Sequence, residues 1–395
     1  MSTLIALVLG IVAILLAVPV AVLALQTLVA FARRVPAPLP PGVRPRLAVL
    51  IPAHNESSGV TPTLKAVRSQ LLDGDRCVVV ADNCSDDTAS VAAAAGAEVL
   101  ERHDIDRRGK GYALDFGLRF LDADPPDVLV VVDADCLLTD GCLDRIGRLS
   151  LATRRPVQAV YLMTAPAPAK RSTQIAEFAF RVKNLARPMG FLRLGLPCQL
   201  MGTGMAFPWP VLRSIDLATG HIVEDLKMGL DLAAAGHPPL FCPDALVTSQ
   251  FPVNEAGTKS QRKRWEHGHL SMIVGTAPGL LWHSLRTRDV ASFALGLDLL
   301  VPPLALLVMA STLFAMLCLA FLAVGGSAWP LLVSLIGLGG LFVAVALAWL
   351  RYGRDVLPLA TLALAPLYAL KKIPLYLRFV VSRQAEWVRS KRDAP

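Results

Sequence analysis

Three long stretches of the chain consist almost entirely of apolar residues. Residues 1–32 and 329–350 contain no charged side chain, and residues 291–324 contain only Asp298. Each stretch is longer than the roughly 20 residues that an α-helix needs to cross the hydrocarbon core of a bilayer. The pattern predicts three transmembrane helices, one at the N-terminal end and two in the C-terminal third.

Between these ends, short apolar runs alternate with helix-forming runs. The apolar runs are rich in Val, Leu and Ile, as strands buried on both faces of a parallel sheet are. The alternation predicts an α/β domain with a mainly parallel sheet and helices on both of its faces. Strands are expected at residues 46–55, 76–83, 97–102, 127–136, 201–208 and 239–251, and helices at 57–72, 86–95, 112–121, 221–236 and 258–272.

The expected strand "VLVVVDADC" ends on two carboxylates, Asp133 and Asp135. Ligands of parallel α/β sheets bind beyond the carboxyl ends of the strands, where the sequence also places Glu56 and Asp82. Four carboxylates at one sheet edge repel one another unless a cation or a donor-rich ligand joins them. Mg²⁺ and Mn²⁺ bind carboxylates together with phosphate oxygens, so a metal-bound diphosphate is the favoured ligand, with a helix N-cap role for the Asp-x-Asp pair as the alternative.

The stretch "RRGKGYALDFGL" places Lys110 between two glycines ahead of an expected helix. A flexible backbone with cationic side chains suits a phosphate-facing loop, and a solvated surface loop is the alternative. The sequence has no GxxxxGK[ST] motif, which argues against a P-loop kinase or ATPase.

Two later stretches carry further candidate residues. Glu224 and Asp225 begin an expected helix, where acidic residues are often only partners of the helix dipole. Gln261, Arg264 and Trp265 are spaced by three and four residues and share a helical face. A basic amphipathic helix lying on the membrane is the alternative for this second stretch.

Composition supports membrane attachment. Hydrophobic residues make up 54% of the 395 residues and charged residues only 18%, with a mean hydropathy of +0.52. Soluble domains have about 45–50% apolar residues.

The net charge of +8 fits basic residues facing anionic lipid, and no basic stretch is interleaved with aromatics, so no nucleic-acid partner is expected. The seven cysteines form no CxxC pair, so neither a zinc site nor a disulfide framework is indicated.

Basic residues flank the apolar runs on one side. The first run lacks a basic region before it, which is typical of an uncleaved anchor. The positive-inside bias then places the α/β domain in the cytoplasm. The short apolar piece 356–370 runs into a basic tail, so we expect a re-entrant or interfacial segment on the same face. The flanking basic residues are Arg33, Arg34, Arg286, Arg288, Arg351 and Arg354.

These observations predict a layout of six segments. They are an N-terminal transmembrane helix (1–34), a Pro-rich linker (35–45), the α/β domain (46–275), a juxtamembrane segment (276–290), two transmembrane helices (291–355) and a basic C-terminal segment (356–395).

Seven motifs follow one another in a recognisable order. They are "IPAHNE", "DNCSDDT", "RGKGYAL", "DADC", "GTGMAF", "ED" and "QRKRW". Over residues 46–275 this series resembles membrane-integrated family 2 glycosyltransferases of the GT-A fold. That group contains the cellulose, chitin and hyaluronan synthases, ceramide glucosyltransferase and bacterial exopolysaccharide enzymes. The resemblance implies a Rossmann-like GT-A domain flanked by transmembrane helices in a bacterial inner membrane.

The resemblance also implies where the sugar nucleotide binds. Asp82 would bind the nucleotide base or ribose, with Pro52, Asn55 and Glu56 beside it, and Lys110 would lie in the phosphate-facing loop.

The remaining roles concern the chemistry. Asp133 would contact the sugar nucleotide and Asp135 would ligate Mn²⁺ or Mg²⁺. Asp225 would be the general base for the acceptor hydroxyl. The residues that would lie against the diphosphate and the acceptor are Glu224, Gln261, Arg264 and Trp265.

The resulting hypothesis is a single transfer. One base acting opposite a stabilised leaving diphosphate predicts inversion, so a UDP-sugar would donate a hexose in β-linkage to a lipid-linked or saccharide acceptor. Two alternatives stay open: a processive β-glycan synthase working with an export partner or as a homo-oligomer, and a nucleotide-sugar binding protein without activity. Asp298 is a functional candidate as a carboxylate in an apolar run, or it is simply solvated near the interface.

Overall fold

The computed structural model describes residues 2–32, 38–252 and 254–381, and it divides into two compact units. Of the described residues, the first unit comprises 2–32, 167–195 and 269–381, and the second comprises 38–166, 196–252 and 254–268. The sheet belongs to the second unit, and the long apolar helices belong to the first.

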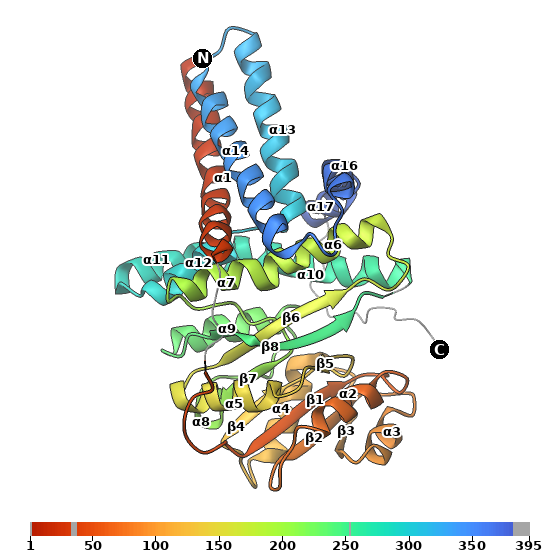
Figure 1. Cartoon of the computed structure of the whole chain (residues 1–395). Helices are drawn as coiled ribbons and strands as arrows, with labels where there is room; N and C mark the ends of the chain where they lie inside the picture. The colour runs from red at the N-terminus through yellow and green to blue at the C-terminus, as the bar shows by residue number, and fades with distance from the viewer. Residues whose placement is uncertain (1, 33–37, 253, 382–395) are drawn as a thin grey trace. The chain divides into compact units, whose positions relative to one another are not determined.

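The second unit is built on an eight-stranded sheet with the order β3-β2-β1-β4-β7-β6-β8-β5 (Figure 1). Strand β1 pairs in parallel with β2 and β4, β2 with β3, and β6 with β8, whereas β7 runs antiparallel to both β4 and β6, and β5 antiparallel to β8. The prediction of a mainly parallel α/β sheet is confirmed. The strands are β1 (Leu47–Ala53), β2 (Arg76–Asp82), β3 (Glu98–Arg102), β4 (Val128–Val131), β5 (Leu137–Leu138), β6 (Val157–Thr164), β7 (Met205–Pro208) and β8 (Leu240–Gln250).

Helices α2 (Val60–Arg68), α3 (Thr88–Ala94), α4 (Lys110–Leu121), α5 (Cys142–Thr153), α8 (Trp209–Leu212), α9 (Glu224–Ala234) and α10 (Glu255–Gly275) belong to this unit, α10 as far as Gly268. The core lies where α4 meets the centre of the sheet, and Leu50, Leu114, Leu118 and Phe207 are all fully or almost fully buried there. A Cβ on Gly117 of α4 would lie 2.4 Å from a methyl of Leu50, so this glycine allows the helix to pack closely on β1.

Several elements are shorter than the sequence predicted, and two of these differences have a visible cause. Helix α2 begins at Val60 and not at residue 57, because the Glu56 carbonyl accepts the backbone N–H groups of Gly59 and Val60, each at 3.0 Å, in a turn. Strand β4 ends at Val131, and the chain then turns so that the Cys136 N–H donates to the Asp133 carbonyl at 3.1 Å. Both changes lie at the carboxyl edge of the sheet.

The first unit consists of helices. Among the described residues, α1, α13 and α14 are long and apolar enough to cross a membrane. Helix α14 packs against both α1 and α13 (Figure 1). The helices are α1 (Ser2–Phe31), α6 (Arg171–Arg181), the π-helix η1 (Val182–Ala186), α7 (Arg187–Arg193), α11 (Ala277–Thr287), α12 (Val290–Leu299), α13 (Leu304–Ala323), α14 (Trp329–Tyr352), α15 (Leu359–Ala363), α16 (Ala365–Leu370) and α17 (Ile373–Val381).

The predicted second span at residues 291–324 is wrong in its extent. The stretch divides into α12 and α13, because Pro302 and Pro303 lie between them and proline cannot continue a helix from the preceding turn. Helix α12 has 10 residues, which is too short to cross a bilayer, so only α13 is a candidate span here.

Asp298 of α12 is buried, so the interpretation that it is simply solvated near the membrane interface is wrong. It is 6% exposed, and one carboxylate oxygen accepts hydrogen bonds from Gln26 Nε2 at 2.6 Å and Arg187 Nη2 at 2.8 Å. A Cβ on Gly190 of α7 would lie 2.1 Å from the Gln26 carbonyl oxygen, so α7 and α1 meet backbone to backbone. The carboxylate therefore joins three helices of this unit.

Residues 356–370 form the short helices α15 and α16, followed by α17. None of the three is long enough to cross a bilayer. The re-entrant or interfacial placement stays a prediction. The flanking residues Arg33 and Arg34 and the basic tail from residue 382 lie outside the described residues.

Candidate active site

The carboxyl ends of β1, β2 and β4 lie at one edge of the sheet. The parallel register pairs Ala53 with Ala81 and Leu50 with Val131, so the loops after these three strands emerge side by side. These loops carry the acidic candidates predicted from the sequence. The structure thus brings the residues after β1, Asp82 at the end of β2 and the Asp-x-Asp pair after β4 to the same edge.

The Asp-x-Asp turn is held by two threonines. The Asp133 N–H donates to Thr203 Oγ1 at 3.0 Å, and Thr63 Oγ1 of α2 donates to the carbonyl between the two aspartates at 2.8 Å. Asp133, Asp135 and Cys136 offer ligand atoms that lie within 4.8 Å of one another. The N-cap alternative is not observed, because α5 begins only at Cys142.

The donor set of this turn suits a hard divalent cation. Burial, and then the charges of Asp135 and Asp133, raise the pKa of the Cys136 thiol well above its usual value, so the thiol remains protonated and a poor ligand for such a cation. One oxygen of Asp133 is in contact with the Lys110 ammonium. Asp135 is then the carboxylate best suited to Mg²⁺ or Mn²⁺, which take few protein ligands and keep sites for water and phosphate oxygens.

Lys110 is the first residue of α4, and its ammonium group lies inside the site. It contacts Asp133 and donates to the Gly202 carbonyl at 2.6 Å. Burial opposes its charge, but Asp133, Glu224 and Asp225 together raise the pKa of Lys110 above its usual value. The solvated-loop alternative is therefore wrong for this lysine, although Arg107 and Arg108 before it are exposed.

A glycine is required on each side of Lys110, for a different structural reason at each position. Gly109 has a φ of +134°, which L side chains rarely adopt. A Cβ on Gly111 would lie 2.5 Å from the Thr219 carbonyl oxygen, so the start of α4 packs directly on a backbone segment.

The "GTGM" loop before β7 lies beside Lys110. Gly202 has a φ of +94°, and a Cβ there would lie 3.3 Å from Asp225 Oδ2 and 3.7 Å from Lys110 Nζ. The Gln158 side chain of β6 holds this loop, because its Nε2 donates to the Thr203 carbonyl at 2.9 Å and its Oε1 accepts the Met201 N–H at 2.7 Å.

Glu224 and Asp225 form the first turn of α9. Burial and the neighbouring Asp225 raise the pKa of Glu224 to about 7, although Lys110 and Arg264 oppose the shift. A role as helix-dipole partners alone does not explain a partly buried acidic pair next to a lysine. Near neutral pH Glu224 can therefore hold a proton.

Gln261, Arg264 and Trp265 all lie on α10, as predicted. Gln261 is 5% exposed, and a Cβ on Gly268 would lie 2.5 Å from Val223, which precedes α9. This part of α10 therefore packs against the start of α9 and does not lie as a free basic helix. Arg264 is close enough to lower the pKa of Glu224, and its Nε makes no hydrogen bond within the described part of the chain.

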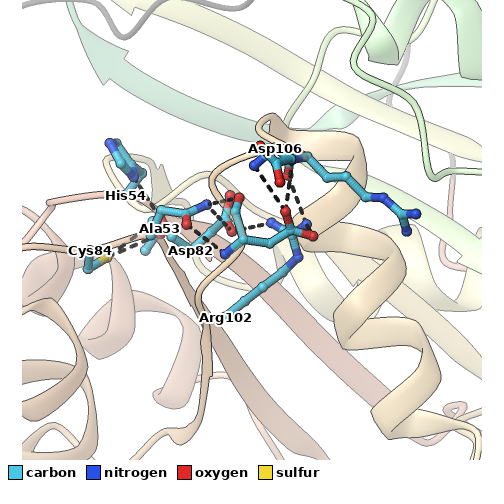
Figure 2. A network of polar contacts seen from close by, with 9 residues as sticks. Ala53, His54, Asp82, Cys84, Arg102 and Asp106 are labelled. Atoms are coloured by element: carbon cyan, nitrogen blue, oxygen red, sulfur yellow. Dashed lines mark hydrogen bonds and ion pairs between the residues drawn. The ribbon is translucent and has the colours of Figure 1, made fainter.

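Asp82 is buried in a polar network (Figure 2). Its Oδ1 accepts hydrogen bonds from Arg102 Nη1 at 2.6 Å and Asn83 Nδ2 at 3.0 Å, and its carbonyl oxygen is 2.6 Å from His54 Nδ1. Burial raises the pKa of Asp82, and Arg102 opposes that shift.

The residues after β1 mainly connect loops. Asn55 Nδ2 donates to Ser85 Oγ at 3.0 Å, and Asn55 Oδ1 accepts the Ser85 N–H at 2.7 Å. The Glu56 N–H donates to Thr88 Oγ1 at 2.8 Å. Pro52 lies within β1 beside Val80. These contacts fix the loop after β1 to the loop after β2, next to Asp82.

Several residues of the site were missed by sequence reasoning: Asn83, Arg102, Asp104, Cys136 and Gln158. A signal existed for Arg102, because it is the last residue of a predicted strand and so belongs to the same sheet edge. Gln158 carried no signal, since its role depends on a loop that is distant in the sequence.

Comparison with known proteins agrees with this geometry. The model of a protein family described as glycosyltransferase like family 2 matches residues 45–268, more than half of the chain. The chain belongs to this family. This match confirms the resemblance at the level of family and fold.

Related proteins carry similar names. The probable glycosyltransferase YdaM of Bacillus subtilis (strain 168) is 26% identical over 261 residues, a match that covers 58% of this chain and 56% of that protein. The chain thus matches just over half the length of this relative. The uncharacterized glycosyltransferase Rv0539 of Mycobacterium tuberculosis (strain ATCC 25618 / H37Rv) is 29% identical over 199 residues, covering 44% of this chain and 85% of that protein.

A solved structure with the same fold is the mannosyltransferase PcManGT from Pyrobaculum calidifontis in complex with GDP-Man and Mn²⁺. The TM-score is 0.55 at 18% sequence identity, and the match covers 94% of this chain and 100% of that chain. The family and this likeness together show the GT-A fold.

Proposed function

We propose that the protein transfers a single hexose from a UDP-sugar to a lipid-linked or saccharide acceptor at the cytoplasmic face of a bacterial inner membrane. One observation carries the proposal: the charged Lys110 lies among the carboxylates of Asp133, Glu224 and Asp225 at the carboxyl edge of the sheet. A glycosyltransferase needs positive charge for a leaving diphosphate and a base for the acceptor, and this cluster supplies both within one site.

Asp135 would hold Mn²⁺ or Mg²⁺, and Asp133 would contact the sugar nucleotide. When bound, the cation would supply Lewis-acid stabilisation of the leaving diphosphate. The choice of a divalent ion is supported by the donor set of the turn and by the Mn²⁺ named for PcManGT.

Two positively charged side chains of the protein, Lys110 and Arg264, would stabilise the same leaving diphosphate. Lys110 stays protonated because of the surrounding carboxylates, so a diphosphate beside Asp133 meets a fixed positive charge. Arg264 adds a second positive charge next to Glu224. Fixed charges in a partly buried site stabilise a developing negative charge without reorganisation.

Asp225 would accept the proton of the acceptor hydroxyl. The raised pKa of Glu224 allows Glu224 to hold a proton near neutral pH, so the base role is proposed for Asp225 and not for Glu224. Attack from the face opposite the leaving group inverts the anomeric centre, so an α-linked UDP-sugar gives a β-linked product. Gln261 and Trp265 would lie on the acceptor side.

The nucleoside would bind at Asp82, beside Pro52, Asn55 and Glu56. The buried carboxylate, held by Arg102 and Asn83, provides a fixed acceptor for a base N–H or a ribose hydroxyl. Attachment to the membrane would use α1, α13 and α14, with membrane lipid as their surroundings.

The test is a donor panel with the full-length protein purified in detergent. UDP-sugars and GDP-mannose are incubated with Mn²⁺, Mg²⁺ or EDTA, and both nucleoside diphosphate release and product size are measured. We expect metal-dependent release of UDP and a product extended by one sugar. A long product would instead indicate a processive synthase working with an export partner or as a homo-oligomer, and no transfer from any donor would contradict the proposal.

A further inference from the structure

Arg102, at the end of β3, lies between two parts of the proposed donor site (Figure 2). The residue is 8% exposed, and its guanidinium donates to three acceptors in two separate segments. Nη1 donates to Asp82 Oδ1 at 2.6 Å, while Nη2 donates to Asp104 Oδ2 at 3.1 Å and to the Arg107 carbonyl at 2.8 Å. One side chain thus holds the buried carboxylate at the end of β2 and the loop that leads to Lys110.

Asn83 reinforces this connection. It has a φ of +52°, its N–H donates to the Arg102 carbonyl at 2.7 Å, and its Nδ2 donates both to Asp82 Oδ1 at 3.0 Å and to the Asp104 carbonyl at 3.1 Å. The Asp104 N–H returns a hydrogen bond to Asn83 Oδ1 at 2.8 Å. The backbone after β2 and the backbone after β3 are therefore tied to each other and to Arg102.

Asp104 shapes the loop that follows. Its Oδ1 accepts the N–H groups of Asp106 at 3.1 Å and Arg107 at 2.9 Å, which folds the chain into a turn ahead of Lys110. The Arg102 guanidinium also lies 5.7 Å from the ring centroid of Tyr112, in the first turn of α4. Arg102 thus contacts both the loop before α4 and the helix itself.

We propose that Arg102 is a positioning residue that couples the nucleoside end of the donor site, at Asp82, to the diphosphate end, at Lys110. The inference rests on the proposed function, because that function assigns donor binding to Asp82 and Lys110. Arginine suits the role since its planar fork reaches three acceptors in fixed directions, whereas a lysine ammonium on a flexible stem cannot reproduce the arrangement.

The same two strands contain a matched control at their other end. Arg76 of β2 donates to Glu98 of β3 through Nε at 2.9 Å and Nη2 at 2.6 Å. Its guanidinium lies 5.0 Å from the ring centroid of Phe120, near the end of α4. This pair repeats the ion pair and the ring contact of Arg102, but it lies away from the carboxyl edge.

The experiment compares R102K and D104N with R76K in the full-length, detergent-purified protein. Binding of UDP and UMP is measured by calorimetry, with KM and kcat for the active UDP-sugar and thermal unfolding as further readouts. We expect R102K to lower the affinity for UDP and UMP and to raise the donor KM, each by about tenfold. The reason is that Arg102 loses hydrogen bonds both to Asp82 and to the loop before Lys110. R76K should change these affinities by less than about twofold, since this partly exposed ion pair lies away from the carboxyl edge and contributes little.

D104N tests the coupling itself. Asp104 and Asp82 accept from different nitrogens of Arg102. The amide that replaces the Asp104 carboxylate keeps an oxygen that accepts from the loop, while the charge that faces Arg102 is lost. If Arg102 couples the nucleoside end to the diphosphate end, D104N lowers the affinity for UMP as well as for UDP by about threefold, because one charged hydrogen bond of Arg102 is weakened. This variant also decides the matter if R102K does not fold, because the Asp104 side chain is 35% exposed.

Two results would overturn the coupling. One is UDP and UMP affinities of R102K and D104N that match the wild type, and the other is an equal loss in R76K, which would show a general effect of strand stability. Failure of the wild type to bind UDP or to release it from any UDP-sugar would refute the proposed function, and this inference with it, before any variant is compared.

Discussion

Asp225 and Glu224 are adjacent carboxylates at the start of α9, yet the structure places them in different electrostatic situations. Burial and Asp225 raise the pKa of Glu224 to about 7, and the Asp225 carboxylate lies against Gly202 beside Lys110. This difference allows one carboxylate to hold a proton while the other accepts one.

Replacing Asp225 should separate turnover from donor binding. We expect D225N to lower kcat by about 10²–10⁴-fold, the usual contribution of a general base, while the affinity for UDP changes little. Steady-state kinetics and calorimetry measure the two quantities. The control is D231N on the same helix, because Asp231 only pairs with Lys227 on a partly exposed surface. Turnover by D225N close to that of D231N would remove the base assignment.

Glu224 should make stability depend on pH in a defined direction. Its pKa in the folded state, about 7, lies above the reference value of 4.5, so the folded protein binds this proton more tightly than the unfolded chain does. The associated stabilisation is present at low pH and is lost as the pH rises through about 7. We therefore expect E224Q to gain stability relative to the wild type as the pH rises from about 5 to about 8. Thermal unfolding over this range measures the difference, and a pH-independent difference would contradict the raised pKa.

Helices α1, α7 and α12 meet around a buried ion pair. Arg187 donates to the Asp298 carboxylate through Nε at 3.2 Å and Nη2 at 2.8 Å, and to the Asp298 carbonyl at 2.6 Å. Gln26 of α1 completes the group. Charges removed from water are costly unless they are paired and hydrogen-bonded, so we expect the stability of this helix contact to depend on both partners being present.

Neutralising one partner of this pair should be strongly destabilising. We expect D298N to lower the free energy of unfolding by about 3–5 kcal/mol, because Arg187 then remains buried without its counter-charge. Chemical unfolding in detergent measures the change. The control is D355N, which removes one carboxylate partner of Arg181 and leaves Glu177 as another. Asp355 is 67% exposed, so this change should cost only about 0–1 kcal/mol.

The double variant R187M/D298L gives a second check on this ion pair. It should recover most of the stability lost in D298N, since an apolar replacement removes both buried charges. Equal costs for D298N and D355N would mean that the buried pair is not what holds these helices.

The described residues combine a domain of the glycosyltransferase family with three long apolar helices, so membrane attachment and orientation can be tested together. We expect the protein to stay with the membrane in alkaline carbonate and to need detergent for extraction, because each span buries about 20 apolar residues in the bilayer. Protease added to inside-out vesicles should digest the domain, as the positive-inside bias predicts. Digestion only in right-side-out vesicles would reverse the proposed orientation, and release by carbonate would contradict the spans.

Much of this architecture was predictable because its causes are local. Runs of branched apolar residues identified β1, β2, β3 and the start of β4, and the acidic residues after them marked the functional edge of the sheet. Glycines with a positive φ, such as Gly109 and Gly202, also have a local cause, since the backbone conformation itself excludes most side chains. The break between α12 and α13 had a local signal as well, in Pro302 and Pro303, but the continuous apolar character obscured it.

Partners that are distant along the chain were not predictable. Gln26 and Asp298 are 272 positions apart, and Lys110 and the Gly202 carbonyl are 92 apart, yet each pair is joined by a direct hydrogen bond. Periodicity, charge and strand ends set the fold class, the apolar helices and the acidic edge, because those features arise from neighbours in the sequence. The partners of Lys110, Arg102 and Asp298 emerged only after folding, because a buried charge is stabilised by whichever acceptors the packed elements place around it.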